Sequence, residues 1–293
     1  MTASGVDNGT GAEWYVGIAN FFLPAVTQSR YNPCATKFHT KERPAMSEEL
    51  TATPEAVGLT AVQRVVNTFI APSKTFEDIK RNRNWALPFI LIFIASLCFT
   101  IVAQKKVGFD RMYEQSLKSS PSQAERFDSM TPEQKTSAMK LGTTITEVIS
   151  YSYTVFILII ALISSLVLWG SFNFLLGAQT SFKDMMAVYM YASLTGLVSV
   201  AIMVLTVYAG GADTFNVQDP IGTNIGYYMG PDTAPWLKSL LASFDIMKIW
   251  FAALLIIGTS IVAKVKRGSA AAVIIGWWVL IILVSVAIKA VTG

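Results

Sequence analysis

The sequence predicts an all-α integral membrane protein, a five-transmembrane-helix bundle with amphipathic surface helices before the first span. Hydrophobic residues make up 53% of the 293 residues and charged residues only 14%, whereas a soluble domain carries about 25% charged residues. The mean hydropathy of the chain is +0.48. This composition leaves too few charges to cover a water-facing surface, and the shortage is concentrated in long apolar runs.

Five apolar runs are long enough to cross a hydrocarbon core of about 30 Å. Because no water is present inside a bilayer to satisfy backbone polar groups, each run is expected to be a helix. The five predicted spans are Leu87–Gln104, Val148–Gly170, Met185–Ala209, Leu240–Ala263 and Ser269–Lys289.

The region before these runs is polar. Residues 1–57 are rich in Gly, Asn, Thr and Pro, and we expect a disordered tail there, followed by a membrane domain over residues 58–293. The apolar patch Trp14–Val26 has no basic region before it, which argues against a secretory signal. Met46 opens a polar lead-in, so residues 1–45 are either a disordered part of the native chain or an extension foreign to it.

Two short amphipathic helices are predicted ahead of the first span. Residues 58–70 carry apolar side chains at helical spacing, and Thr75–Arg83 would have Phe76 and Ile79 on one side. These helices either lie on the membrane surface or pack against the bundle itself. In the first case four basic residues would contact lipid headgroups: Lys74, Lys80, Arg81 and Arg83.

Residues 72–88 contain signals for helix ends and for entry into the membrane. Pro72 is expected to end the first helix, and either Ser73 or Thr75 to cap the second, Thr75 with Asp78 as its capping-box partner. Trp85 would lie at headgroup level, and Pro88 in the first turn of the span.

The connections between spans differ in character. Residues 105–147 predict a small helical cap outside the bilayer, with Pro121 and Pro132 in the first turns of its helices. Residues 210–238 predict an ordered loop at the membrane surface. The last two spans are joined by a short link with three basic residues, which marks the cytoplasmic side. These residues are Lys264, Lys266 and Arg267.

This link predicts a cytoplasmic N-terminus and an external C-terminus. Lys105 and Lys106 follow the first span directly and weigh against that orientation, although long segments count less in the positive-inside rule.

Asp245 and Lys248 are three residues apart and therefore share one face of the fourth predicted span, close to Trp250. An ionisable pair within a span is a functional candidate, here for a proton or ion relay. The alternative is that the two charges neutralise each other near the interface and orient the helix. The other pair, Lys183 and Asp184, is expected in a loop at a span boundary.

The fifth span carries small residues every fourth position, at Gly268, Ala272 and Gly276. Such a face lets a neighbouring helix approach closely. The neighbour is either another helix of the same chain or a second copy of the protein.

Signatures of catalysis are absent from the sequence. It contains no Walker loop, no nucleophile elbow and no HExxH motif. The one histidine, His39, lies in the polar tail, and Cys34 and Cys98 form neither a disulfide framework nor a metal pattern. The net charge of +4 comes from basic residues that flank apolar spans. We therefore expect no enzyme, no metal, no cofactor and no nucleic-acid partner.

Three motifs of the sequence are shared with one family of membrane proteins. The first is the run APSKTFEDI at residues 71–79, with Trp85 and Pro88 after it; the second is DIMKIW at residues 245–250, followed by Leu254 and Gly258. The third is the loop containing Asp219-Pro220 and Asn224. Together they resemble the bacterial branch of the YIP (Ypt/Rab-interacting protein) domain family. The resemblance covers about residues 62–289, agrees with the count of five spans, and implies a bacterial inner membrane.

Eukaryotic members of that family bind prenylated Rab GTPases and help to organise Golgi and ER membranes. Bacterial members have no Rab partner, and no residue here supports GTPase binding. The sequence therefore favours a non-enzymatic scaffold or membrane-organising factor. It would act through the lipid bilayer and through other membrane proteins or a homo-oligomer. The alternative is a small solute or ion transporter or channel subunit, with Asp245 and Lys248 lining the path.

Overall fold

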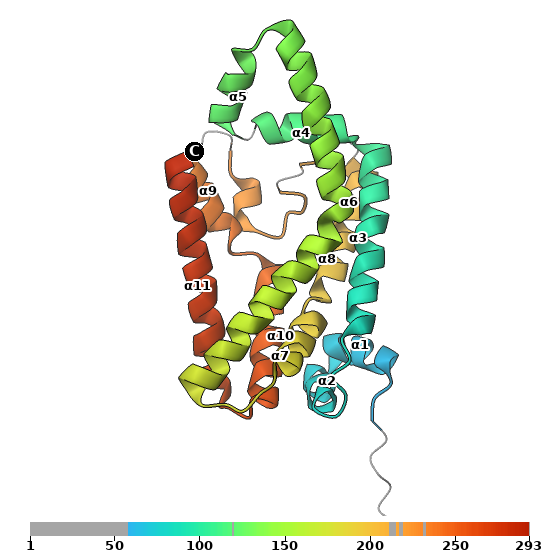
Figure 1. Ribbon diagram of the computed structural model, residues 1–293, viewed down its shortest axis with the longest axis vertical. Coiled ribbons are helices and arrows are strands. Elements are labelled where there is room, and N and C mark those ends of the chain that lie inside the picture. The colour runs from blue at the N-terminus through green and yellow to red at the C-terminus, as the bar shows by residue number, and fades with distance from the viewer. Residues whose placement is uncertain (1–57, 119, 211–214, 217–218, 231–232, 293) are drawn as a thin grey trace, which may run out of the picture. The chain divides into compact units, whose positions relative to one another are not determined.

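The computed structural model describes residues 58–118, 120–210, 215–216, 219–230 and 233–292, all within one compact unit, Pro54–Gly293. The predicted tail over residues 1–57 lies outside the described residues. The elements that can be described are all helical (Figure 1). They are α1 (Ala61–Ile70), α2 (Pro72–Ile79), α3 (Ala86–Lys106), α4 (Phe109–Lys118), α5 (Pro121–Asp128), α6 (Pro132–Gly170), the π-helical turn η1 (Ser171–Leu175), α7 (Phe182–Ala192), α8 (Thr195–Gly210), the 3₁₀ turn η2 (Ile225–Tyr228), α9 (Pro235–Ala242), α10 (Ile246–Val262) and α11 (Arg267–Thr292).

Four segments are long and apolar enough to cross a membrane. They are Ala86–Lys106, Pro132–Leu175, Phe182–Gly210 and Arg267–Val291. In Figure 1, α6 extends well past the upper end of α3, and α4 and α5 lie beside this extension. Pro121 and Pro132 each occupy the first turn of a helix, which confirms the predicted starts.

The sequence predicts the fourth span as one helix over residues 240–263, but the structure divides it into two helices. The chain forms α9, breaks at residues 243–245, and continues as α10. The 17 residues of α10 rise about 25 Å, less than the roughly 30 Å of a hydrocarbon core. Hydropathy does not reveal the break, because the residues on both sides of it are apolar.

The short helices α1 and α2 begin in different ways, α1 with a side-chain cap and α2 with a proline. Thr60 and Gln63 form a capping box at the start of α1. The predicted capping of α2 by Thr75 with Asp78 is wrong, because α2 begins at Pro72 and has no side-chain cap. Proline supplies no N–H at the first helical position, so that start loses little without a cap.

The core of the bundle surrounds α7. Its residues Met185, Val188 and Tyr191 are fully buried and belong to one apolar cluster with side chains of α2, α6 and α10. The last helix, α11, is the least covered of the candidate spans, with 6% of its most apolar window buried. A side chain at Gly268 or Gly276 of α11 would meet open space, so these two glycines have no close neighbour within the described chain.

Candidate functional site

Asp245 lies in the break between α9 and α10, and both oxygens of its carboxylate accept hydrogen bonds. One carboxylate oxygen accepts from the backbone N–H of Met247 at 2.7 Å and of Lys248 at 3.4 Å. The other accepts from the Thr223 hydroxyl at 2.9 Å. Asp245 is thus the N-cap of α10, where a carboxylate satisfies free N–H groups and faces the positive end of the helix dipole. The residue is only 7% exposed.

The loop before α9 pairs with this break. Asn224 forms an isolated antiparallel bridge with Asp245, and the N–H of Ile246 donates to the Thr223 carbonyl at 3.1 Å. The Asn224 amide donates to Asp219 at 2.8 Å and accepts from the N–H of Tyr227 at 2.9 Å. Backbone groups that the break frees are therefore bonded within the protein, as non-helical backbone in an apolar setting requires.

The turn η2 lies directly against α9. A Cβ built at Gly226 would be 2.8 Å from both the Lys238 carbonyl oxygen and the Ala242 amide nitrogen. Only glycine permits this distance between the two backbones. The loop predicted at the membrane surface thus packs, through residues 223–228, on the broken helix.

The three predicted candidates of the fourth span face different surroundings. The Lys248 ammonium donates to the Ala242 carbonyl at 3.0 Å, and Lys248 is not an ion-pair partner of Asp245 in the described chain. Trp250 makes an edge-on contact with Phe69 of α1, with ring centroids 5.7 Å apart. Lys248 lines a cavity between α6, α10 and α11, and Asp245 does not.

A second polar cluster joins α1 to α2. Arg64 is 2% exposed and forms an ion pair with Asp78, while one of its N–H groups donates to the Asn82 carbonyl at 3.0 Å. The hydroxyls of Thr68 and Thr75 both donate to the Arg64 carbonyl, at 2.8 and 2.9 Å. Sequence reasoning missed Arg64, because a lone arginine on a short amphipathic helix is ordinarily solvent-exposed.

Two of the four basic residues assigned to headgroup contact have acidic partners. Arg81 pairs with Asp78 at 3.0 Å, and Arg83 pairs with Asp184 of α7 at 2.6 Å. Lys74 and Lys80 are exposed. Asp184 also accepts from the Ser181 hydroxyl at 2.7 Å as part of a capping box. The Arg83 ion pair therefore ties the segment before α3 to the start of the central helix α7.

The remaining residues of the motif before α3 pack against protein. Phe76 and Ile79 are fully buried in the core cluster. Trp85 is half-buried and contacts Phe89 edge-on, with ring centroids 6.1 Å apart, and Pro88 is buried in the first turn of α3. Pro72 lies at the first position of α2.

The outward side of α1 is apolar. Val62, Val66 and Ile70 are 66%, 50% and 75% exposed, and their spacing of four residues aligns them on one face. The polar residues Arg64 and Thr68 of the same helix are buried against the protein. Val65 and Phe69 of α1 pack on the core, so the helix presents apolar side chains both to the protein and to its surroundings, unlike a helix on a water-soluble protein, whose outward face is polar.

Within the described ranges, no group of three His, Cys, Asp or Glu side chains could hold a metal ion. The clusters around Asp245 and Arg64 consist of capping hydrogen bonds and ion pairs, and they stabilise the contacts between helices.

A family model described as the Yip1 domain matches residues 66–288, which is more than two thirds of the chain. The match includes α2, the broken helix and its loop. No curated protein and no solved structure matches the chain.

Proposed function

The chain belongs to the Yip1 domain family, and from this premise we propose a non-enzymatic, five-span protein that organises the bacterial inner membrane. It acts through lipid contacts and through other membrane proteins or a second copy. The residues that act are those of α1, and the rest of the bundle holds this helix at the membrane surface.

The course of the chain supports five passages. In Figure 1, α1 and α2 lie at the lower end of α3, while the C-terminal end of α11 lies at the upper end. Because α1 and the end of α11 lie on opposite sides of the bundle, the chain between them must cross the membrane an odd number of times. The segments α9 and α10 together supply the additional crossing, since α10 alone is short.

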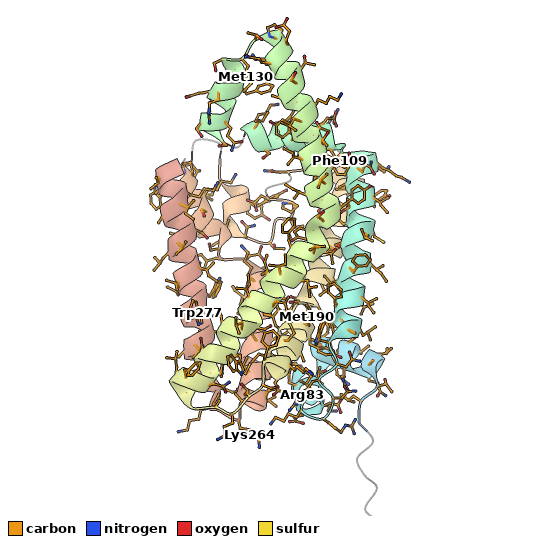
Figure 2. All side chains as sticks on the ribbon, in the orientation of Figure 1. Arg83, Phe109, Met130, Met190, Lys264 and Trp277 are labelled. Atoms are coloured by element: carbon orange, nitrogen blue, oxygen red, sulfur yellow. The ribbon has the colours of Figure 1, made fainter. Side chains whose placement is uncertain are left out.

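The distribution of positive charge supports a cytoplasmic lower end. Arg83 and Lys264 lie at the same end of the bundle in Figure 2. Lys266 and Arg267 follow Lys264 in a short link, where basic residues carry most weight in the positive-inside rule. The N-terminal side is therefore assigned to the cytoplasm and the C-terminus to the outside.

The observation that carries the proposal is the orientation of α1. Its apolar ridge, formed by Val62, Val66 and Ile70, points away from the protein. Removing a valine or isoleucine side chain from water gains about 1.5–3 kcal/mol, so this ridge favours the acyl boundary of the cytoplasmic leaflet. The buried Arg64–Asp78 ion pair fixes α1 to α2, so that the ridge and the bundle move together.

An environment-sensitive fluorophore tests the position of this ridge. The full-length protein, with Cys34→Ser and Cys98→Ser, is labelled at Val66→Cys with NBD and reconstituted in vesicles. We expect blue-shifted emission that is quenched by brominated acyl chains. The control is Glu77→Cys, an exposed acidic position on α2, which should report an aqueous environment. Equal, water-like emission from both positions would contradict membrane insertion of α1.

The organising role is tested on membrane nanotubes drawn from giant vesicles. The wild-type protein should be enriched on the curved tube relative to the vesicle, because an inserted ridge expands one leaflet. Replacing Val62, Val66 and Ile70 with serine should abolish the enrichment. Leu141→Ser, which removes an exposed apolar side chain from α6, should leave it unchanged. Wild-type protein distributed evenly between tube and vesicle would refute the role.

A further inference from the structure

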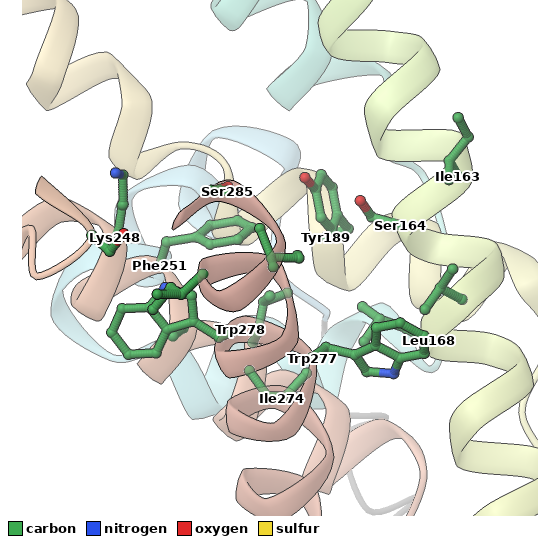
Figure 3. A pocket seen from close by; sticks show the side chains of 16 residues that line it. Ile163, Ser164, Leu168, Tyr189, Lys248, Phe251, Ile274, Trp277, Trp278 and Ser285 are labelled. Carbon is green, nitrogen blue, oxygen red and sulfur yellow. The ribbon is translucent and has the colours of Figure 1, made fainter. Parts of the chain in front are cut away.

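A cavity of about 490 Å³ lies between α6, α10 and α11 (Figure 3). Its volume is within the range of about 300–1,000 Å³ that is typical of ligand sites. The lining residues Ile163 of α6 and Ile281 of α11 are 58% and 60% exposed, so the cavity reaches the surface between these helices. Both helices belong to candidate membrane spans, and the opening therefore faces hydrocarbon in a bilayer.

The cavity is polar at one end and apolar at the other. Lys248 and Ser285 lie at one end in Figure 3, and Leu168 and Ile274 lie at the opposite end. Ser243, in the break before α10, also contributes to the lining. This division resembles that of a phospholipid, which has a charged headgroup and apolar chains.

Lys248 supplies the charge of the polar end. Its ammonium donates to the Ala242 carbonyl at 3.0 Å, and two of its three N–H donors remain for another acceptor. No aspartate or glutamate is among the residues that line the cavity, and no ion pair within the described residues involves Lys248. Lys248 is exposed on the protein, and a positive charge that faces the apolar part of a bilayer is costly without an anion, so this end favours an anionic group.

The apolar end is unsuited to water. An ordered water in a protein needs two to four polar partners, whereas Leu168, Leu255 and Ile274 offer apolar surface. An empty space of this size would forfeit many dispersion contacts. Acyl chains are the apolar material that surrounds these helices in a membrane.

We propose that this cavity binds one anionic phospholipid of the surrounding bilayer, with its phosphate on Lys248 and one acyl chain between α6 and α11. The break before α10 shapes the site, because it places Ser243 and Lys248 in the lining of the cavity. The proposal does not depend on the role assigned to α1, since no residue of α1 lines the cavity.

Native mass spectrometry of the detergent-solubilised full-length protein measures the affinity for individual lipids. Lys248→Gln should weaken binding of an anionic phospholipid about tenfold, the equivalent of one charge-assisted hydrogen bond. The matched control is Lys289→Gln, an exposed lysine in the last turn of α11 that does not line the cavity, and it should bind as the wild type does. Inorganic phosphate should not displace the lipid.

A second variant tests the chain-binding end without a change of charge. Ala252 lines the cavity, and Ala252→Phe should reduce lipid retention at least tenfold while the melting temperature stays close to that of the wild type. In wild-type proteoliposomes, an anionic lipid with a diazirine in its acyl chain should crosslink to α6 and α11 residues of the lining. This measurement is independent of how any variant folds.

Three results would overturn the proposal. They are wild-type affinity in Lys248→Gln, displacement of the lipid by phosphate alone, and crosslinks spread evenly over lipid-facing helices such as α3.

Discussion

Gly258 of α10 lies against Phe76 of α2 so closely that a Cβ at position 258 would be 2.8 Å from the phenylalanine Cε1 atom. Val188 of α7 is equally near, with its Cγ1 atom at 2.6 Å. Both neighbours are fully buried. Two residues from different family motifs therefore meet in the core, and the short helix α2 is held against the bundle through this contact.

We expect Gly258→Val to destabilise the protein, because rigid side chains on two helices would have to move. Overpacking of this kind costs about 1–3 kcal/mol. The control is Gly276→Val on α11, where an added side chain meets open space. Unfolding of both variants in mixed detergent micelles measures the difference. Equal stability of the two variants would contradict the close approach of α10 and α2.

Asp78→Asn should release α1 from α2. Arg64 would keep its charge while buried at 2% exposure, and loss of one partner of a buried ion pair costs about 3–5 kcal/mol. The readout is proteolysis of the segment between α1 and α3. Glu77→Gln, at the exposed neighbouring position, is the control. The double variant Arg64→Met with Asp78→Leu should be less sensitive to protease than Asp78→Asn, since it leaves no buried charge.

The variant Asp245→Asn distinguishes the scaffold hypothesis from the transporter hypothesis. Asparagine is nearly as good an N-cap as aspartate, so the variant should retain its fold, whereas Asp245→Ala should lose about 0.5–2 kcal/mol. We expect no difference in ion or solute flux between wild-type and Asp245→Asn proteoliposomes. Flux that is present in the wild type and lost in the folded asparagine variant would establish the transporter instead.

Lys80→Glu should reduce contact with anionic lipid without loss of stability. Lys80 is exposed, and a basic residue near an anionic surface contributes about 1 kcal/mol. The measurement is the fraction of anionic phospholipid that is co-extracted with the protein in polymer nanodiscs. Lys140→Glu, at an exposed position on α6, is the control. Arg83→Glu should in contrast destabilise the protein, because the new carboxylate would face Asp184.

Gly226→Ala should detach the loop from α9. The added methyl group would meet the backbone of residues 238 and 242, and backbone atoms of a helix cannot yield individually. Chymotrypsin cleavage at Tyr227 and Tyr228 should become faster. Gly230→Ala, with open space around it, should leave the cleavage rate unchanged, and an equal rate in both variants would argue against the contact.

Local patterns predicted many of the elements. The starts of α5 and α6 follow from Pro121 and Pro132, because proline is favoured in the first turn. The break at Asp245 could not be predicted from local patterns. Hydropathy averages over about twenty residues, and one aspartate hardly changes that average. The break depends on Thr223 and Asn224, which supply hydrogen bonds from a separate segment.

The sequence by itself determined the membrane class, the family and the approximate position of the apolar helices, since length and hydropathy are properties of each segment alone. It also determined that α1 has two faces, because the helical period separates Val62 and Val66 from Arg64. Only the tertiary structure decided that Arg64 is turned inward while Val62 and Val66 are turned outward. Burial of the Arg64 charge requires an acidic partner, and Asp78 on α2 provides it.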